Sequence, residues 1–323
     1  MSARPGIVVL DDYEQAMRRC ADWSAIDRAA DVTVHHGKLR GDDLLAAIGE
    51  ADAIAVVRDR TPFKADLLAK LPKLRYLVFT GARNTQLDAA AFAARAIPVS
   101  HTEKDPGKDS TAEHTWALIL AASRRLEAGL AMVREGRWRD GGPLAAILKG
   151  ERLGLIGFGE IGQRVGRVGA AFGMEVVTWS PHMTAERAAQ GGAKAVSLEE
   201  LLATSKVASL HLVPSETTRK LLDAPRLASM RHDSILVNTS RSTLIDMAAL
   251  PAALASGRPG TAALDVFDEE PLPAGFALAK LPNVVLTPHV GFVAEPVYQK
   301  FARGMVECLE AWLAGKPLVR VLA

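Results

Sequence analysis

Three short stretches of the sequence carry side chains suited to acid–base chemistry on an anionic substrate. They span residues 238–241, 265–272 and 287–291, and each follows an apolar run that predicts a buried strand. His289 could give or take a proton near neutral pH. A carboxylate such as Glu270 could fix the tautomer of that histidine and stabilise its charged form. The guanidinium of Arg241 could hold a substrate carboxylate at two points and polarise a carbonyl.

Each of these residues also has an ordinary structural interpretation. His289 could be a satisfied loop histidine, Arg241 an exposed arginine at a helix start, and Glu270 part of a solvated acidic turn with its two acidic neighbours. Parallel strands, however, end at a common sheet edge, where ligands of α/β folds bind. An arginine, a carboxylate and a histidine at that edge are the three types that hydride transfer to a 2-oxo acid requires.

A glycine-rich turn lies upstream of these loops. The apolar run 153–156 predicts a strand, and Gly157-x-Gly159-x-x-Gly162 follows it. A helix comes next, with an apolar face of Ile161, Val165, Val168 and Phe172, and then a second strand at 174–179. We expect Gly157 to form the tight turn, Gly159 to let a pyrophosphate approach, and Gly162 to let helix and strand pack closely. The free N–H groups at the helix start would hold the phosphates. A glycine-rich turn without a ligand is the alternative.

The first hundred residues predict a small parallel α/β sheet. The expected strands are 6–10, 32–34, 53–57 and 74–79, with helices at 42–48 and 64–71 between them. Two loops would then lie at the ligand-binding edge, residues 58–62 and residues 80–84. A solvated charge cluster and a plain turn are the respective alternatives.

The remaining sequence predicts a doubly wound nucleotide domain. A long helix is expected at 109–134, capped by Asp109 or Ser110. The side chains expected on its inner face are Ala112, Trp116, Ile119, Leu120 and Leu126. Strands follow at 207–212, 234–238, 261–264 and 284–286, with helices at 197–203 and 246–256. The last helix, 295–314, should return to the first domain. The expected domains are therefore 1–98 with 291–323 for the substrate, and 99–290 for the nucleotide.

Composition narrows the class of protein. The 323 residues are 49% hydrophobic and 24% charged, as in an ordinary globular protein. A net charge of +2 gives no electrostatic reason for binding nucleic acid or an anionic membrane. The two cysteines lack metal-ligand spacing, which predicts no metal site and favours a reducing cytoplasm. The first five residues lack the apolar core of a signal peptide, and no apolar run reaches the roughly 18–20 residues of a membrane span.

The chain resembles the D-isomer-specific 2-hydroxyacid dehydrogenases, a family that includes phosphoglycerate dehydrogenases and glyoxylate/hydroxypyruvate reductases. The resemblance covers nearly the whole chain and depends on residues 155–162, 237–241, 264–272 and 287–291. It implies a Rossmann domain inserted in a flavodoxin-like substrate domain. It also implies NAD(P)-dependent interconversion of a small 2-oxo acid and its D-2-hydroxy acid. In that reaction Arg241 would anchor the substrate, Glu270 would pair with the histidine, and His289 would be the acid/base.

The resemblance further implies binding residues. The cofactor set is Gly157, Phe158, Gly159, Glu160, Ile161, Gly162, Ser180, His211, Pro214, Thr239, Ser240 and Asp265. Asp265 is expected near the nicotinamide carboxamide. The substrate set is Arg58, Arg60, Gly81, Ala82 and Arg83, where backbone amides would help to hold the carboxylate. His101 and His114 are interpreted as packing or cofactor-edge residues. Relatives pair through the region of the long helix and residues 136–138, whose apolar and aromatic character favours a homodimer.

Two positions depart from the family pattern. Ser180 stands where an aspartate commonly binds the ribose hydroxyls of NAD, so NADP would not be repelled, and His182 or Arg187 could meet its 2′-phosphate. Arg83 stands where many members have glycine, which suggests a substrate with an extra polar or anionic group.

Two other functions compete with the dehydrogenase. A nucleotide-sensing corepressor would share the fold, but the intact set of Arg241, Glu270 and His289 disfavours it. Formate dehydrogenases need no proton acceptor and lack the glutamate, so Glu270 argues against that chemistry. Because no regulatory domain follows the last helix, we do not expect an allosterically controlled phosphoglycerate dehydrogenase.

Overall fold

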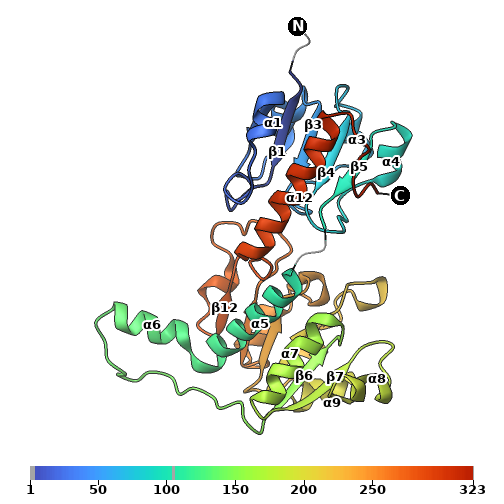
Figure 1. Cartoon of the computed structure of the whole chain (residues 1–323). Helices are drawn as coiled ribbons and strands as arrows, with labels where there is room; N and C mark the ends of the chain where they lie inside the picture. Colours follow the sequence, from blue (N-terminus) through green and yellow to red (C-terminus); the bar gives the residue numbers. More distant parts are fainter. Residues whose placement is uncertain (1–3, 104–105, 323) are drawn as a thin grey trace. The chain divides into compact units, whose positions relative to one another are not determined.

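A computed structural model describes residues 4–103 and 106–322 and divides the chain into two compact units (Figure 1). Unit 1 comprises the chain as far as Pro106 together with the segment from Val293 onward, and unit 2 spans Gly107–Phe292. The sequence-based domain boundaries are 98/99 and 290/291, whereas the two compact units meet at 106/107 and 292/293. The prediction about the extreme N-terminus falls on Met1–Ala3, which lies outside the described residues.

Unit 1 is built on a parallel sheet whose strand order, β2-β1-β3-β4-β5, is that of a flavodoxin-like fold. The strands are β1 (Gly6–Leu10), β2 (Asp31–Val34), β3 (Ala53–Val56), β4 (Tyr76–Phe79) and β5 (Val99–His101). In register, Val8 of β1 pairs with Thr33 of β2 and Ile54 of β3. Every residue of β3 and β4 is buried, as expected for central strands covered on both faces.

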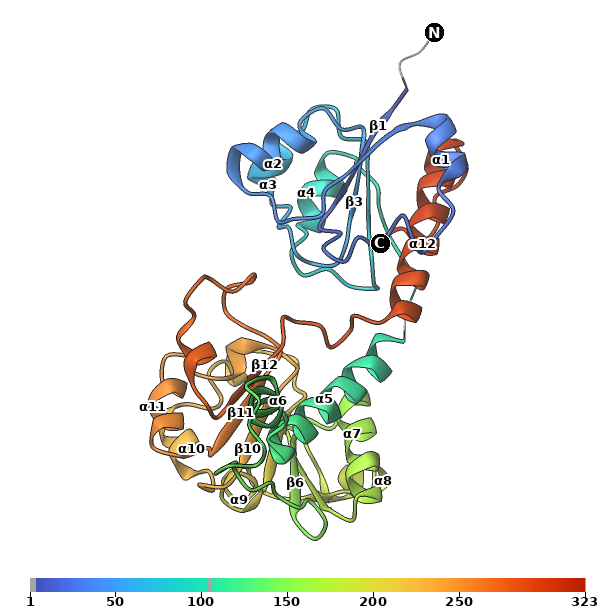
Figure 2. The same cartoon turned by 90° about the vertical axis from the view of Figure 1, so that its left-hand side faces the viewer.

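Helices cover both faces of this sheet. They are α1 (Ser24–Ala29), α2 (Gly41–Ile48), α3 (Ala65–Leu68), α4 (Ala89–Ala94) and α12 (Glu295–Leu313). In Figure 2, α1 and α12 lie on one face and α2, α3 and α4 on the other. The rings of Tyr76 on β4 and Trp312 on α12 are stacked with their centroids 5.6 Å apart. The last helix of the chain therefore completes the core of unit 1.

Unit 2 is a doubly wound domain with the sheet order β12-β11-β10-β9-β6-β7-β8. Its strands are β6 (Arg152–Ile156), β7 (Glu175–Trp179), β8 (Lys194–Ala195), β9 (Val207–Leu210), β10 (Ile235–Asn238), β11 (Thr261–Leu264) and β12 (Val284–Leu286). Counted from β6, this is the 3-2-1-4-5-6 order of a dinucleotide-binding fold with one further strand. The expected fold class, two parallel α/β sheets, is confirmed.

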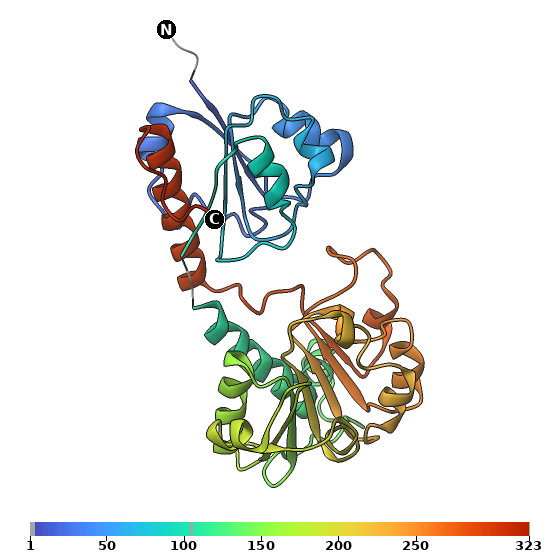
Figure 3. The same cartoon turned by 90° about the vertical axis from the view of Figure 1, so that its right-hand side faces the viewer.

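The helices of unit 2 form two layers. They are α5 (Gly107–Arg124), α6 (Leu126–Arg134), α7 (Glu160–Ala171), α8 (Ala185–Gln190), α9 (Leu198–Thr204), α10 (Ala224–Ser229) and α11 (Leu250–Ala255). Alternate residues of each strand face opposite cores. Leu155 packs with Trp116 of α5, whereas Ile156 packs with Leu201 of α9. Figure 3 shows the green helices on one side of the sheet and the gold and orange helices on the other.

The prediction of one long helix at 109–134 is wrong in two respects. The helix begins earlier, at Gly107, so Asp109 and Ser110 lie inside its first turn and do not cap it. It is also broken at Arg125, whose φ of +53° is left-handed, and α6 starts afresh after it. Leu126, expected on the inner face, is consequently 49% exposed. An apolar periodicity of 3.6 continues across the break and gives no sign of it.

The other differences between the predicted and the observed elements are smaller. Strands β5 and β8 were not predicted because they are short, with three and two residues respectively. The helix expected from 246 begins at Leu250. The apolar face expected on α7 consists of Ile161, Val165, Val168 and Phe172. Val165 is buried as expected, but Val168 and Phe172 are partly exposed. The rest of the buried face consists of Gly162, Gly166 and Gly169, whose lack of a side chain brings the helix close to the sheet.

Within the described residues, no helix is both long and apolar enough to cross a membrane. Over the same residues, no cluster of three or more histidine, cysteine or acidic side chains is arranged to hold a metal ion.

Candidate active site

The three chemistry-bearing loops leave adjacent strands of unit 2. Arg241 follows β10, Glu270 follows β11 and His289 follows β12, and β10, β11 and β12 are neighbours in the sheet. Because the strands are parallel, the loops emerge at one edge. The structure thus brings these loops together, as the sequence predicts.

Glu270 and His289 form a hydrogen-bonded pair. The Nδ1 atom of His289 lies 2.7 Å from Oε2 of Glu270, while Oε1 accepts a bond from the Phe267 amide at 2.9 Å. Burial alone would raise the pKa of Glu270, but the hydrogen bond and charge of His289 hold it below its ordinary value. Glu270 is therefore ionised at neutral pH, and the imidazole donates from Nδ1. This arrangement leaves Nε2 as the nitrogen for proton exchange with another molecule.

The backbone of His289 is held in an unusual conformation. Its φ is +57°, in the left-handed region that non-glycine residues seldom occupy. The ring meets Phe292 edge-on, with centroids 5.9 Å apart. Such a conformation persists only where surrounding contacts over-determine it.

Asp265 supplies those contacts. One carboxylate oxygen accepts the Val290 amide at 2.9 Å and the Thr287 hydroxyl at 2.6 Å, and the other accepts the Gly291 amide at 2.8 Å. Burial would raise the pKa of Asp265, but these donors and His114 hold it below its ordinary value. The Asp265 carboxylate thus accepts hydrogen bonds from the loop that carries His289. Its expected place near a nicotinamide carboxamide stays a prediction.

The turn that presents Arg241 is shaped by Asn238, the last residue of β10. Its side-chain oxygen accepts the Ser240 amide at 3.0 Å, and its Nδ2 donates to the Arg241 carbonyl at 2.9 Å. Arg241 itself is exposed, with Nη1 donating to the Ser240 carbonyl. An exposed guanidinium on a fixed turn suits capture of an anion from solvent.

The glycine turn has the geometry of a phosphate cradle. Gly157 has φ of +99°, and a Cβ there would lie 2.7 Å from the His211 carbonyl oxygen. A Cβ at Gly162 would collide with the Gly157 carbonyl, whereas a Cβ at Gly159 would meet nothing within 4 Å. The turn is therefore packed on its inner side and open at Gly159, where the 12-residue helix α7 begins. These residues fit a dinucleotide pyrophosphate.

The end of β7 bears the residues that would meet the adenosine ribose. Ser180 starts a turn closed by the Met183 amide, and Arg187 of α8 donates from Nη1 to the His182 carbonyl at 2.7 Å. Arg187 is thus folded back over the loop after β7. It also lines a cavity of about 190 Å³ with Phe158, Gln163, Met183, Gln190 and Gly191.

Other expected cofactor residues have defined partners. The Ser240 hydroxyl donates to the Leu212 carbonyl at 2.5 Å, which ties the loop after β10 to the loop containing Pro214. The Nε2 atom of His211 lies 2.9 Å from the Ser209 hydroxyl, and burial lowers the pKa of His211 to about 4. Neutral His211 therefore packs beneath the glycine turn. The remaining residue, Thr239, is bonded to Thr115 of α5 at 2.8 Å.

The expected substrate residues lie at the corresponding edge of unit 1. Arg58 has φ of +66°, and its amide donates to Thr80 at 2.8 Å. A Cβ at Gly81 would lie 2.5 Å from Nη1 of Arg58, so glycine is needed there for Arg58 to take this position. The Gly81 amide donates to Thr102 at 2.8 Å, and so it already has a protein partner. Ala82 and Arg83 continue this loop, with Arg83 exposed.

The guanidinium of Arg60 forms hydrogen bonds with other residues of unit 1. Its guanidinium donates to both carboxylate oxygens of Glu14, at 2.8 and 3.1 Å, and to the Asp11 carbonyl at 2.6 Å. The same group lies 4.1 Å from the centre of the Tyr13 ring. These contacts favour a supporting role for Arg60, which holds the loop after β3 against the loop after β1.

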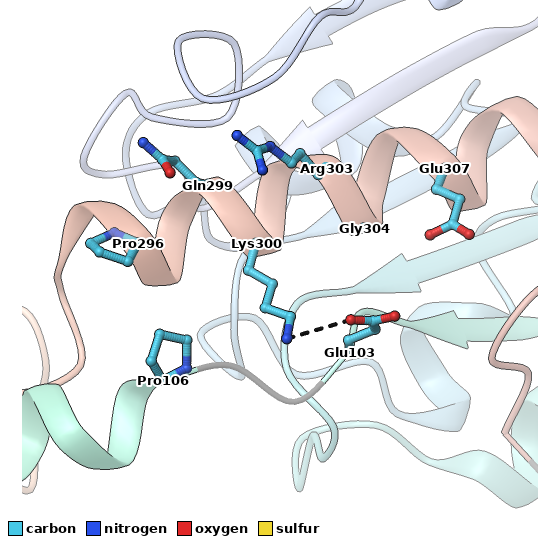
Figure 4. Close-up of a pocket in the computed structure, with 8 residues that line it drawn as sticks. All are labelled: Glu103, Pro106, Pro296, Gln299, Lys300, Arg303, Gly304 and Glu307. Carbon is cyan, nitrogen blue, oxygen red and sulfur yellow. Dashed lines mark ion pairs between the residues drawn. The ribbon is translucent and has the colours of Figure 1, made fainter.

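A larger cavity of unit 1, about 520 Å³, contains none of the predicted site residues. Figure 4 shows Lys300 of α12 reaching Glu103 beyond β5, with 3.5 Å between the charged atoms. Arg303 and Glu307 also line it, so its charges of opposite sign balance.

Three residues organise the site although no such role was predicted for them: Asn238 and Thr287 lie within the predicted loops, and His114 was interpreted as a packing or cofactor-edge residue. Asn238 shapes the arginine turn, Thr287 bonds Asp265, and His114 lies 2.9 Å from Thr287. Asn238 was recognisable from its place two residues before Ser240, where asparagine commonly bonds the backbone of a turn. The contacts of His114 and Thr287 join distant parts of the chain and leave no local signal.

Known proteins resemble this chain over most of its length. Residues 116–291 match the family model described as D-isomer specific 2-hydroxyacid dehydrogenase, NAD binding domain. Glyoxylate reductase from Aeropyrum pernix is 38% identical over 285 residues, which cover 85% of this chain and 84% of that protein. D-3-phosphoglycerate dehydrogenase from Mycobacterium bovis is 38% identical over 275 residues. That match covers 85% of this chain and 52% of the relative, so the chain spans about half the length of that protein.

A solved structure agrees with these matches. Phosphoglycerate oxidoreductase from Vibrio cholerae superposes with a TM-score of 0.88 at 32% identity, covering 96% of this chain and 99% of that one. The chain belongs to the D-isomer specific 2-hydroxyacid dehydrogenase family. Unit 2 accordingly contains a binding domain for a nicotinamide cofactor.

Proposed function

We propose that the protein is an oxidoreductase that interconverts a small 2-oxo acid and the corresponding D-2-hydroxy acid. The observation that carries this proposal is the 2.7 Å bond between Glu270 and His289, at the sheet edge that also presents Arg241. An imidazole oriented by an ionised carboxylate suits proton transfer at a carbonyl or hydroxyl oxygen. Both A. pernix glyoxylate reductase and M. bovis D-3-phosphoglycerate dehydrogenase bear names that agree with this chemistry.

Each side chain has a distinct task in this reaction. The nicotinamide cofactor, when bound, supplies a hydride to the carbonyl carbon in reduction or takes one from it in oxidation. His289 gives its Nε2 proton to the carbonyl oxygen in reduction and accepts the hydroxyl proton in oxidation. Glu270 keeps Nδ1 protonated and stabilises the imidazolium form. Arg241 binds the substrate carboxylate through paired N–H groups and polarises the carbonyl.

We assign substrate binding in unit 1 to Arg58 and to the loop that contains Gly81, Ala82 and Arg83. Arg60 supports these residues through Glu14, because its donors already serve that carboxylate. The exposed charge of Arg83 favours a substrate with a second polar or anionic group. Unit 1 is thus the substrate domain and unit 2 the nucleotide domain.

For the cofactor we propose NAD, with NADP tolerated. The pyrophosphate would be held by residues 157–162 and the ribose by Ser180, with Thr239, Ser240 and Pro214 lining the site. Ser180 carries no charge that would reject a 2′-phosphate. Arg187, folded back over the neighbouring loop, is a cation within the same region.

We also propose a cytoplasmic homodimer. Its support is a group of large apolar side chains exposed on α6 and on the segment after it: Leu130, Val133, Trp138, Leu144 and Ile147. Trp138 is 72% and Leu144 94% exposed. Figure 1 shows α6 and the following segment extending from the rest of unit 2. Large apolar side chains exposed together on one segment are typical of an interface.

The test is a panel of 2-oxo acids assayed with NADH and with NADPH. We expect oxidation of the reduced cofactor with at least one acid and formation of the D-hydroxy product. Binding of NADH without turnover of any acid would favour a nucleotide-sensing protein. Reduction of NAD by formate, with no activity on 2-oxo acids, would establish the formate dehydrogenase alternative.

A further inference from the structure

Helix α5 presents polar side chains to all three catalytic loops of unit 2. Ser110 and His114 are four residues apart and so lie on the same face of this helix, and Thr115 directly follows His114. The Ser110 hydroxyl donates to the Gly291 carbonyl at 2.8 Å, in the loop that carries His289. Thr115 bonds Thr239 at 2.8 Å, two residues before Arg241.

His114 makes the central contact of this face. Its Nε2 atom lies 2.9 Å from the Thr287 hydroxyl and 3.3 Å from Oδ1 of Asp265. Thr287 opens the loop of His289, and Asp265 opens the loop of Glu270. The histidine ring therefore joins the two loops whose side chains form the acid–base pair.

The direction of these hydrogen bonds follows from counting protons. The Thr287 hydroxyl has one proton and donates it to Asp265 at 2.6 Å. It can only accept from His114, so Nε2 of His114 must carry a hydrogen. By the same reasoning Thr115 donates to the Thr111 carbonyl, and Thr239 must donate to Thr115. Each contact is thus a satisfied donor–acceptor pair.

The fit around this contact is close. A Cβ at Gly291 would lie 3.0 Å from Oδ2 of Asp265 and 3.7 Å from Cδ2 of His114. His114 is largely buried, with 18% of its side chain exposed, and Asp265 is fully buried. The loop therefore has little freedom to move without displacing His114.

We propose that His114 is a positioning residue for the acid–base pair, donating from Nε2 to the Thr287–Asp265 pair and so fixing the loop of His289. Ser110 and Thr115 secure the same loop and the arginine loop from either side. The expected effect of His114 on turnover rests on the proposed dehydrogenase function. Its effect on the loop is independent of that function.

The experiment compares His114→Leu, which lacks the donor, with His114→Gln, which keeps an N–H donor. Glu113→Gln, an exposed change on the same helix, is the control. In His114→Leu we expect kcat to fall by roughly 10- to 100-fold, the scale of a small misplacement of a catalytic group. We expect His114→Gln to recover kcat to within about fivefold of the parent, a rescue that simple loss of packing would not allow.

Hydrogen exchange gives a readout that needs no turnover. The Val290 and Gly291 amides donate to Asp265, so their exchange should accelerate in His114→Leu and return toward the parent rate in His114→Gln. Unchanged exchange and unchanged kcat in His114→Leu would overturn the proposal, as would a glutamine variant as impaired as the leucine variant. Altered exchange in a protein that turns over no 2-oxo acid would refute the proposed function alone.

Should His114→Leu fail to fold, Ser110→Ala provides the same test with a milder change. It removes only the bond to the Gly291 carbonyl. We expect faster exchange at Gly291 and its neighbours and a fall in kcat of about 2- to 10-fold, the worth of one hydrogen bond. A Ser110→Ala variant with parental exchange and turnover would overturn the proposal.

Discussion

Nδ1 of His289 lies 2.7 Å from Oε2 of Glu270, although His289 adopts a left-handed backbone conformation with φ of +57°. A strained residue kept in hydrogen-bonding geometry indicates that its surroundings fix the imidazole. The surroundings here are the Asp265 carboxylate and the face of α5. Proton transfer from Nε2 is the chemistry that this placement favours.

Replacing His289 by alanine should lower kcat by about 10²–10⁴, the usual contribution of a positioned acid or base. The measurement is the steady-state rate with NADH and the best 2-oxo acid of the panel. His232→Ala, an exposed histidine elsewhere on unit 2, is the control and should behave as the parent. A His289→Ala variant with near-parental turnover would remove the residue from the mechanism.

Replacing Glu270 by glutamine should lower kcat by roughly 10- to 100-fold, the scale of a small misplacement of a catalytic group. The variant loses the ionised acceptor that lies 2.7 Å from Nδ1 of His289 and orients the imidazole. Steady-state rates with NADH and the best 2-oxo acid of the panel measure this loss. If turnover stays at the parental level, Glu270 belongs to an ordinary acidic turn.

Replacing Asp265 by asparagine should lower the free energy of unfolding by about 1–3 kcal/mol at pH 7, because buried amides lose a charged acceptor. The pKa of Asp265 is held below its ordinary value, so its contribution to stability is complete above the unfolded pKa of about 3.9. That contribution is lost as the pH falls through the folded pKa. Denaturant unfolding of both proteins at several pH values should show the difference narrowing below about pH 4. Asp268→Asn, an exposed neighbour, should change little.

The homodimer prediction is tested by mass in solution. Leu130→Asp places a charge on the apolar surface of α6 and should yield a monomer at micromolar concentration, whereas the parent should be a dimer. Val213→Asp is the matched control, since Val213 is also exposed but lies outside this surface. Light scattering after gel filtration distinguishes the two masses. A monomeric parent would contradict the prediction directly.

The sequence predicts the fold and the chemistry-bearing loops because both depend on local patterns. Apolar runs and a glycine turn establish the parallel strands, and the loops after β10, β11 and β12 must then meet at one edge. The connection between His114 and Thr287 spans 173 residues and follows only from the assembled sheet. The pairing of Arg60 with Glu14 likewise joins two loops, and without it Arg60 resembles a substrate ligand. The break at Arg125 lacks the glycine that usually marks a left-handed residue.

The last prediction concerns the choice between NAD and NADP. An aspartate at position 180 would accept hydrogen bonds from the ribose hydroxyls and repel a 2′-phosphate, whereas Ser180 can do only the first. Arg187 lies with its guanidinium on the His182 carbonyl, 2.7 Å away, and so a cation is held at the loop after β7. We therefore expect kcat/KM for NADH and NADPH to differ by no more than about two orders of magnitude, roughly 3 kcal/mol.

Two variants separate these contributions. Ser180→Asp should reduce kcat/KM for NADPH at least tenfold and leave NADH nearly unchanged, because the new charge repels only the phosphate. Arg187→Ala should lower kcat/KM for NADPH by about 2- to 5-fold, as expected for an exposed ion pair with a phosphate. Arg167→Ala, an exposed arginine of α7, is the matched control. A parent that prefers NADH more than a thousandfold would mean that another group rejects the phosphate. An equally strong preference for NADPH would make His182 and Arg187 direct ligands of the phosphate.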